Sequence, residues 1–214
     1  MDAFACPYWC RETFLGRAMA DDLLSHARAS GGSFMPSRIG SAETARLDPG
    51  HRISQVTREI GPLAATFRGR IRRSVPAALD AIGMRDFTVG EIELEMAAHG
   101  DGAFFASHVD TQLASSHSDR GPRMLSAVYY FHALPRRFSG GALRLHAYHS
   151  DPGPDGHVDI EPVHDRLIVF PSSARHEVLR VVCPGIGFDD WRFALNCWVR
   201  KASDDPGAVL EPEA

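Results

Sequence analysis

The feature that most constrains the fold is a change in hydrophobic period near residue 88. Residues 91–96 read Glu-Ile-Glu-Leu-Glu-Met, so acidic and apolar side chains alternate strictly, as in a strand with one buried face. Further strand-like runs follow, and pieces rich in Gly and Pro separate them. These runs lie at 103–110, 123–132, 141–147, 158–162, 166–171, 175–182 and 191–199. Many short strands with such turns favour a sandwich, a jelly roll or a barrel.

The first half of the chain predicts helices and loops instead. Apolar residues recur at helical spacing over 11–29 and 61–83, whereas the Gly- and Pro-rich residues 30–52 suit a loop with short extended pieces. Pro76 lies inside the second helical stretch, where a proline can break or kink a helix. We therefore expect a mainly β (α+β) chain in which N-terminal helices buttress a β core. As a division of the chain, this predicts one domain over 1–214, with a helical or mixed buttress at 1–87, the core at 88–201 and a tail at 202–214.

Composition and charge exclude several classes of protein. The 214 residues are 44% hydrophobic, which suits one globular domain with a substantial core. The net charge of −4 leaves no basic footprint for nucleic acid, and we interpret the basic run at 68–73 as a solvated helix face. No apolar run approaches the roughly 20 residues that span a bilayer, and the N-terminus lacks a signal-peptide pattern. We expect a soluble, cytoplasmic protein with no nucleic-acid or membrane partner.

The four cysteines do not indicate a structural metal site. Cys6, Cys10, Cys183 and Cys197 form no Cys-X-X-Cys pair, so a zinc site of that type is not predicted. Free thiols in a reducing compartment are the simplest interpretation.

A different set of residues predicts a metal centre. His108, Val109 and Asp110 form a His-X-Asp triplet, and side chains at i and i+2 of a strand point to the same face. His176 lies on a later predicted strand, so two neighbouring strands of a closed β structure could bring His108, Asp110 and His176 around one ion. Two imidazoles and one carboxylate are typical of iron(II) sites that keep positions open for other ligands. By contrast, His146, His149, His157 and His164 share no obvious strand face, and we expect surface or packing roles for them.

The last predicted strand adds an arginine to this set. Arg192, Ala194, Asn196 and Trp198 share one face, while the alternate residues are apolar and are expected to pack against the helices. An arginine that faces the interior needs an anionic partner, because an unpaired buried charge is unfavourable. A bound dicarboxylate would supply that partner.

These residues and their surroundings resemble a known family. From about residue 90 to 200 the chain resembles the iron(II)- and 2-oxoglutarate-dependent dioxygenases, in particular the prolyl-4-hydroxylase-like branch. The segments that carry the resemblance are 105–110, 123–131, 139–145, 166–171, 176–178 and 192–198. The chain departs from relatives at Phe105, where they often have a tyrosine, and at 183–190, where the turn between the last two strands is longer.

The resemblance implies a fold, a set of site residues and cofactors. The fold is a double-stranded β-helix, a jelly-roll variant with the metal at one open end. His108, Asp110 and His176 would be the catalytic iron ligands, and Arg192 would pair with the C5 carboxylate of 2-oxoglutarate. The hydroxyl of Tyr130 would reach the same carboxylate, although a plain core aromatic is an equal interpretation. The cofactors would be Fe(II), 2-oxoglutarate and O2, with ascorbate as a possible reductant.

The resemblance also implies a reaction, and several alternatives remain open from the sequence. The first hypothesis is hydroxylation of an unactivated C–H bond on a prolyl residue in a peptide or protein. The alternatives are hydroxylation of a free amino acid or small metabolite, a non-catalytic metal-binding cupin-like sensor, and a zinc hydrolase with the same ligands. Residues 111–122 follow the first two ligands and are interpreted as a mobile lid or a passive connection. The sequence leaves the oligomeric state open.

Overall fold

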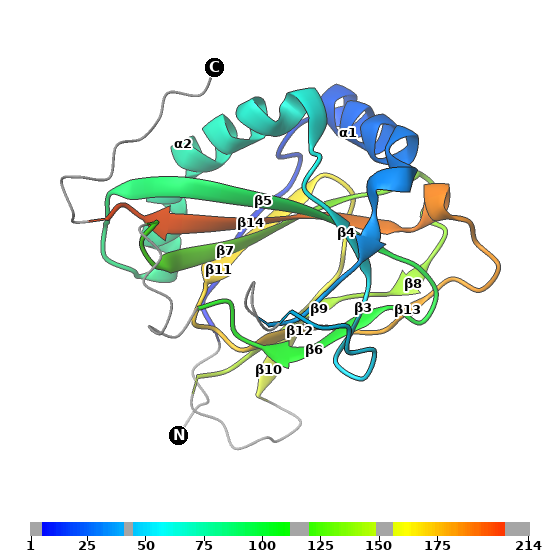
Figure 1. The fold of residues 1–214 in the computed structure, drawn as a ribbon. Coiled ribbons are helices and arrows are strands. Elements are labelled where there is room, and N and C mark those ends of the chain that lie inside the picture. The colour runs from blue at the N-terminus through cyan, green and yellow to red at the C-terminus, as the bar shows by residue number, and fades with distance from the viewer. Residues whose placement is uncertain (1–5, 41–44, 112–119, 149–155, 204–214) are drawn as a thin grey trace.

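Two antiparallel β-sheets form the core of the computed structural model, which describes residues 6–40, 45–111, 120–148 and 156–203 (Figure 1). The larger sheet has seven strands, in the order β1 (Trp9–Arg11), β11 (Arg166–Pro171), β7 (Arg123–Phe131), β14 (Arg192–Lys201), β5 (Val89–His99), β4 (Gln55–Thr57) and β2 (Met35–Pro36). The smaller sheet has five, in the order β10 (His157–Ile160), β9 (Leu143–His146), β12 (His176–Val178), β6 (Phe104–His108) and β3 (Arg52–Ile53). A separate ribbon pairs β13 (Val181–Val182) with β8 (Ser139–Gly140).

Helices cover one face of the larger sheet. Figure 1 shows α1 (Arg17–Ala29) and α2 (Ala64–Ile82) lying across β5, β14 and β7, on the side away from the smaller sheet. Short 3-10 turns complete the elements, namely η1 (Gly31–Ser33), η2 (Gly61–Leu63) and η3 (Phe188–Asp190). The predicted class, a mainly β jelly roll with minor N-terminal helices, is confirmed.

The larger sheet separates two apolar cores. One lies between this sheet and the helices, and it contains the β14 residues that alternate with the polar ones, as predicted: Phe193, Leu195, Cys197 and Val199. The other lies between the two sheets and includes Tyr130, Leu145, Ile168, Phe170 and Ala194. Because each β14 side chain faces one core or the other, the strand alternation decides which residues reach the interior between the sheets.

Each predicted strand from residue 88 onward corresponds to a strand in the structure, but the N-terminal half also supplies strands that the sequence analysis did not name. β1 pairs with β11, β3 with β6 and β4 with β5, so this half enters both sheets. These segments have two or three residues, which is too short for an alternating pattern to be recognised. The division at 87/88 and the single-domain assignment stay predictions.

The predicted helix over 11–29 begins later than expected, because residues 9–11 form β1 and α1 begins at Arg17. Gly16, with φ of 84°, turns the chain between them, a conformation that glycine adopts without strain. The second helix agrees with its prediction and continues through Pro76 without a break. Pro76 lies on the exposed side, and the buried stripe of α2 holds the helix together. That stripe consists of Phe67, Ile71, Val75, Ala78, Leu79 and Ile82.

Most of the acidic face of β5 is turned away from solvent, although the sequence pattern alone would allow it to be exposed; Glu91, near the start of the strand, is 40% exposed. The side chains of Glu93 and Glu95 are 13% and 14% exposed, and they pair with Arg123 and Arg52 at 2.7 and 3.2 Å. The alternation therefore marks a strand whose polar face lies over an interior lined with ion pairs.

Other expectations concern the cysteines, a membrane crossing and two segments near the site and the C-terminus. The four cysteines are free thiols, as expected. Neither α-helix of the described residues has the length and apolar character that a membrane crossing requires. The proposed lid at 111–122 and the tail from 202 fall mostly on 112–119 and 204–214, outside the described residues.

Asp165 ties the N-terminal segment to the sheet. Its carboxylate accepts hydrogen bonds from the backbone N–H groups of Leu15 and Gly16, at 2.8 and 2.9 Å, and from the hydroxyl of Tyr129 at 2.9 Å. Asp165 is buried and has a positive φ of 62°. One carboxylate thus places the start of α1 against β7.

We expect Asp165→Asn to lower the free energy of unfolding by about 2 kcal/mol. The amide nitrogen of Asn cannot accept a hydrogen bond, so one buried donor is left without a partner. Asn tolerates a positive φ as Asp does, so backbone strain stays constant. Urea denaturation measures the loss. The matched control is Asp159→Asn, which disrupts an exposed pair with Arg144 and should change stability by less than about 1 kcal/mol. Equal losses in both variants would contradict the anchoring role.

Candidate metal centre

Strand pairing brings the three predicted ligands together. β12 pairs with β6 in a register that sets His176 opposite His108, and β6 ends at His108. Asp110 lies two residues beyond the strand, where its backbone N–H donates to the carbonyl of Ser172 at 3.0 Å. The expectation that Asp110 lies on the strand is therefore wrong, but its side chain still converges with the two imidazoles. One ligand atom from each residue lies within 4.8 Å of the others.

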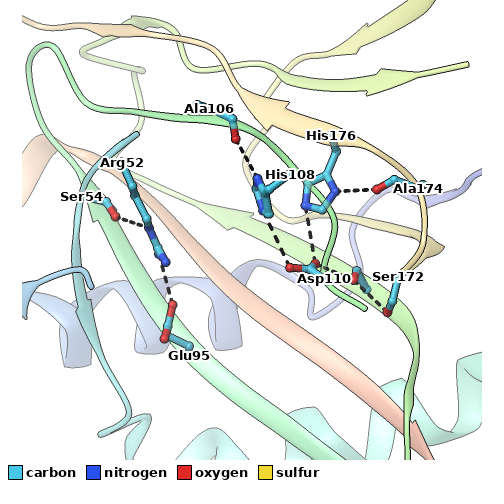
Figure 2. A network of polar contacts seen from close by, with 10 residues as sticks. Arg52, Ser54, Glu95, Ala106, His108, Asp110, Ser172, Ala174 and His176 are labelled. Carbon is cyan, nitrogen blue, oxygen red and sulfur yellow. Dashed lines mark hydrogen bonds and ion pairs between the residues drawn. The ribbon is translucent and has the colours of Figure 1, made fainter. Parts of the chain in front are cut away.

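The ring nitrogens that face the centre are free to bind a cation. His108 Nδ1 donates to the carbonyl of Ala106 at 2.8 Å, and His176 Nδ1 donates to the carbonyl of Ala174 at 2.9 Å (Figure 2). Since a carbonyl only accepts, each Nδ1 carries the proton of the neutral ring, and each Nε2 has a lone pair. The Nε2 atoms of His108 and His176 lie 3.7 and 3.5 Å from the Asp110 carboxylate.

Two hydroxyl groups orient the carboxylate. Ser126 Oγ donates to Asp110 Oδ2 at 2.6 Å, and the hydroxyls of Ser126 and Ser172 lie 3.0 Å apart. Such second contacts hold a ligating carboxylate in one orientation. Ser126 lies on β7 and Ser172 directly follows β11, so the larger sheet positions a ligand that follows a strand of the smaller sheet.

The electrostatics favour the protonation states that bind a cation. Burial, together with the neighbouring His176, lowers the pKa of His108 to about 3. Burial alone would raise the pKa of Asp110, but His176, His108 and the Ser126 hydroxyl outweigh it and lower that pKa. At neutral pH the centre therefore offers a neutral imidazole and an ionised carboxylate.

The ring of Phe105 packs against the imidazole of His108. The two rings stack with centroids 3.6 Å apart and an interplanar angle of 17°. The guanidinium carbon of Arg52 lies 4.6 Å from the centroid of the Phe105 ring. Arg52 also pairs with Glu95 (Figure 2). Phe105 therefore packs against a predicted ligand and offers no hydroxyl to the pocket.

Arg192 lies in the same pocket and is fully buried. Its Nε donates to the carbonyl of Gly141 at 2.9 Å, and its Nη1 donates to His99 Nδ1 at 3.1 Å. Its Nη2 has no hydrogen-bond partner, and no carboxylate of the described residues pairs with this guanidinium. Gly141, with φ of 70°, permits the close approach, because a Cβ there would lie 2.7 Å from Arg192 Cδ.

Tyr130 lies beside Arg192, with the guanidinium carbon 5.0 Å from the ring centroid. Its hydroxyl is buried without a hydrogen-bond partner, and burial raises the pKa of Tyr130 to about 12, so the hydroxyl keeps its proton. The ring also belongs to the core between the sheets. The structure is thus compatible with both interpretations of Tyr130, as a core aromatic residue and as a hydroxyl donor near Arg192.

One pocket connects the predicted residues with several that the sequence analysis missed. It is lined by His108, Asp110, His176 and Arg192 and by the β14 residues Asn196 and Trp198. The missed residues are His99, Arg52 and Ser126. His99 continues the alternating face of residues 93 and 95, so extending that pattern to residue 99 would have found it. Arg52 and Ser126 come from elements that approach only through sheet pairing.

Three of the four other histidines considered in the sequence make polar contacts in the structure. His146 contacts Glu177, His157 lies 3.9 Å from Asp159, and His164 accepts from the backbone of His132. His149 lies outside the described residues. Within the described ranges, His108, Asp110 and His176 are the one group with metal-ligand spacing.

The longer turn at 183–190 packs against the core. Trp191 donates from its indole to the carbonyl of Ile186 at 2.9 Å, and the centroid of its ring lies 5.3 Å from that of Phe188. These contacts indicate a packing role for the turn.

The donor set and the pocket therefore fit a hard or borderline divalent cation with an acidic ligand. Two imidazole nitrogens and one carboxylate oxygen face a common point, and they leave coordination positions for other ligands. The unpartnered Nη2 of Arg192 is a buried charged donor that a carboxylate would satisfy.

Comparisons with known proteins agree with this geometry. The sequence profile of the 2OG-Fe(II) oxygenase superfamily matches residues 94–200. An uncharacterised PKHD-type hydroxylase of Synechocystis sp. is 36% identical over 149 residues, or 68% of this chain. The match spans 48% of that relative, so the chain covers about half of its length.

Two solved structures share the fold. A prolyl-4-hydroxylase of Pseudomonas putida has a TM-score of 0.65 and 21% identity, and the match covers 92% of this chain and 93% of that one. A Trichoplax adhaerens prolyl hydroxylase, in complex with a peptide fragment of the hypoxia inducible factor oxygen degradation domain, has a TM-score of 0.65 and 18% identity. That match covers 91% of this chain and 84% of the other.

We expect Mn(II), or Fe(II) without oxygen, to raise the melting temperature of the protein, because a ligand that binds only the folded state stabilises it. At 100 times the Kd the stabilisation is about 2.7 kcal/mol. His176→Ala should lose this shift, since it removes one of three ligand atoms. The matched control, His157→Ala, removes a histidine near the exposed Asp159 and should keep it. Thermal shifts at increasing metal concentration measure both, and equal responses would rule out the predicted ligand set.

We also expect the chelator-treated protein to lose stability as pH falls from 6.5 toward 3. The pKa of His108 is about 3 in the folded chain and 6.5 in its ordinary state, so the unfolded chain binds a proton that the folded chain excludes. His108 alone then lowers the free energy of unfolding by up to about 1.4 kcal/mol per pH unit in this window. Urea denaturation at pH 7, 6 and 5 measures the slope. His108→Gln should make the slope shallower by the contribution of His108, while His99 and His132, whose pKa values burial also lowers, keep the rest of it. His157→Gln should leave the slope unchanged, and the same slope in all three proteins would contradict the burial of a neutral His108.

Proposed function

Because the chain belongs to the 2OG-Fe(II) oxygenase superfamily, we propose that it is an Fe(II)- and 2-oxoglutarate-dependent dioxygenase that hydroxylates an unactivated C–H bond. The proposed substrate is a prolyl residue in a peptide or protein. One observation carries the proposal: three metal-ligand side chains and a buried arginine without an anionic partner line one pocket.

His108, Asp110 and His176 would hold the iron. The two imidazole Nε2 atoms and the carboxylate would supply three ligands and would leave coordination positions for the co-substrate and for O2. Bound iron(II) would supply the redox chemistry by which 2-oxoglutarate, O2 and a C–H bond become succinate, carbon dioxide and an alcohol. The carbonyls of Ala106 and Ala174 keep both rings in the tautomer that this role requires.

Arg192 would pair with the far carboxylate of 2-oxoglutarate. Its Nη2 is the free donor, and the protonated hydroxyl of Tyr130 is a second buried donor beside it. A charged, fully buried guanidinium fixes the distance and orientation of a dicarboxylate more strictly than a solvated one. A zinc hydrolase with the same three ligands would leave this guanidinium without a role.

The substrate class rests on similarity. One solved neighbour is a prolyl hydroxylase that holds a peptide fragment, which supports a peptide for this chain too. A free amino acid or small metabolite is the alternative, and a screen of both kinds distinguishes them. Ascorbate is included as a reductant in the succinate-release assay described below. A sensor module that binds metal without turnover would release no succinate in any of these assays.

Substrate-dependent release of succinate with Fe(II), 2-oxoglutarate and O2 tests the proposal. Prolyl peptides are compared with free amino acids as substrates. In each reaction the amount of succinate is compared with the amount of hydroxylated product, measured by mass spectrometry. We expect activity in the wild type that a chelator abolishes. No succinate with any substrate, from protein that binds metal, would overturn the enzymatic function.

Arg192→Met provides an independent test of the co-substrate site. We expect the 2-oxoglutarate KM to rise by roughly 100-fold, because a charged hydrogen-bonding partner of the carboxylate is lost. Without ligand, the variant should be as stable as the wild type or more so, because it removes a buried charge that lacks an anionic partner. Steady-state kinetics and urea denaturation measure the two effects. A marked loss of stability with an unchanged KM would instead indicate that Arg192 is structural.

A further inference from the structure

On the inner face of β5, glutamates pair with arginines at two positions, whereas at a third position a histidine meets an arginine. Side chains two residues apart on a strand share a face, so residues 93, 95, 97 and 99 point toward the smaller sheet. At the first two positions a glutamate pairs with arginine: Glu93 with Arg123 and Arg200, and Glu95 with Arg52. Buried or half-buried arginines on this face are therefore normally paired with a carboxylate.

His99 occupies the fourth position and lies directly opposite Arg192 in the pairing of β5 with β14. Cross-strand neighbours on one face are in contact distance, and here Arg192 Nη1 lies 3.1 Å from His99 Nδ1. His99 is 3% exposed and lines the pocket together with Arg192. The most deeply buried arginine on this face therefore meets an imidazole where its neighbours meet a carboxylate.

The direction of this hydrogen bond makes His99 a neutral acceptor. A guanidinium only donates, so Nδ1 of His99 accepts and the ring proton is on Nε2. Burial and the adjacent charges of Arg192 and Arg52 hold the pKa of His99 well below its usual range, which keeps the ring uncharged at neutral pH. The other acceptor of Arg192, the carbonyl of Gly141, is also uncharged. The guanidinium is held in place at two points, yet its charge is not neutralised by either.

We propose that His99 is a positioning residue that orients Arg192 through an uncharged acceptor, so that the full charge of the guanidinium is reserved for the distal carboxylate of an acidic ligand. This inference rests on the proposed co-substrate role of Arg192. A carboxylate at position 99 would hold the arginine equally well, but it would compete with the ligand for the same charge. The choice of an imidazole over a carboxylate thus sets the affinity for dianionic ligands without any contact at the metal.

Two variants of equal size separate charge from hydrogen bonding. His99→Asn keeps an uncharged acceptor, because the amide oxygen occupies nearly the place of Nδ1, whereas His99→Asp puts a carboxylate there. His99→Leu removes the acceptor without adding charge and serves if the Asp variant does not fold. Binding is measured by calorimetry on Mn(II)-loaded protein without oxygen, so the readout does not depend on turnover. The probes are 2-oxoglutarate and 2-oxopentanoate, which has the same chelating end and lacks the distal carboxylate.

We expect the wild type and His99→Asn to prefer 2-oxoglutarate over 2-oxopentanoate by a similar factor. His99→Asp should lose roughly 100-fold in affinity for 2-oxoglutarate, and His99→Leu roughly tenfold, while 2-oxopentanoate binds all four proteins alike. Equal affinity of the Asp and Asn variants for 2-oxoglutarate would overturn the inference. An equal loss of both probes in the variants would also overturn it, since that pattern indicates general damage to the pocket.

The same experiment distinguishes this inference from the proposed function. A wild type that binds both probes equally would refute the co-substrate role of Arg192, and the role of His99 would fall with it. A wild type that prefers 2-oxoglutarate, together with an Asp variant that keeps the preference, would refute the role of His99 alone.

Discussion

The antiparallel pairing of β6 with β12 is the interaction on which the centre depends. It sets His108 opposite His176, from segments far apart in the chain, and the carbonyls of Ala106 and Ala174 then fix both ring orientations. Asp110 follows β6 and completes the group from just outside the strand. A slip of one residue in this register would turn one imidazole to the other face of the sheet. The three candidate ligands therefore converge only in this pairing.

Charge is distributed unevenly over the interior between the sheets. Glu93 and Glu95 neutralise arginines on one face of β5, whereas Arg192 meets only uncharged acceptors. A buried charge without a counterion destabilises the folded state, and such a cost is characteristic of a site that awaits a ligand. The proposed binding of an acidic co-substrate would offset it. Stability and function are in this way linked through Arg192.

Local patterns predicted most of the elements. The strict alternation after residue 88 and the apolar stripe of α2 each follow from one period, and both are present. The patterns failed where tertiary contacts outweigh them. α1 begins late because Asp165 and Gly16 hold the chain before it in a turn, and Pro76 is tolerated because it lies on the exposed side of a well-packed helix. Strands as short as β3 have too few residues to show a period.

The sequence by itself determined the mainly β class of fold, the kinds and order of the candidate metal-ligand residues, and the two faces of β14, because these follow from strand periodicity and from side-chain chemistry. Only the tertiary structure decided that Asp110 lies beyond its strand, that Phe105 stacks on His108, and that His99 is the partner of Arg192. The reason is physical. A period determines which face a residue occupies, but sheet pairing between distant segments determines which residue it meets there.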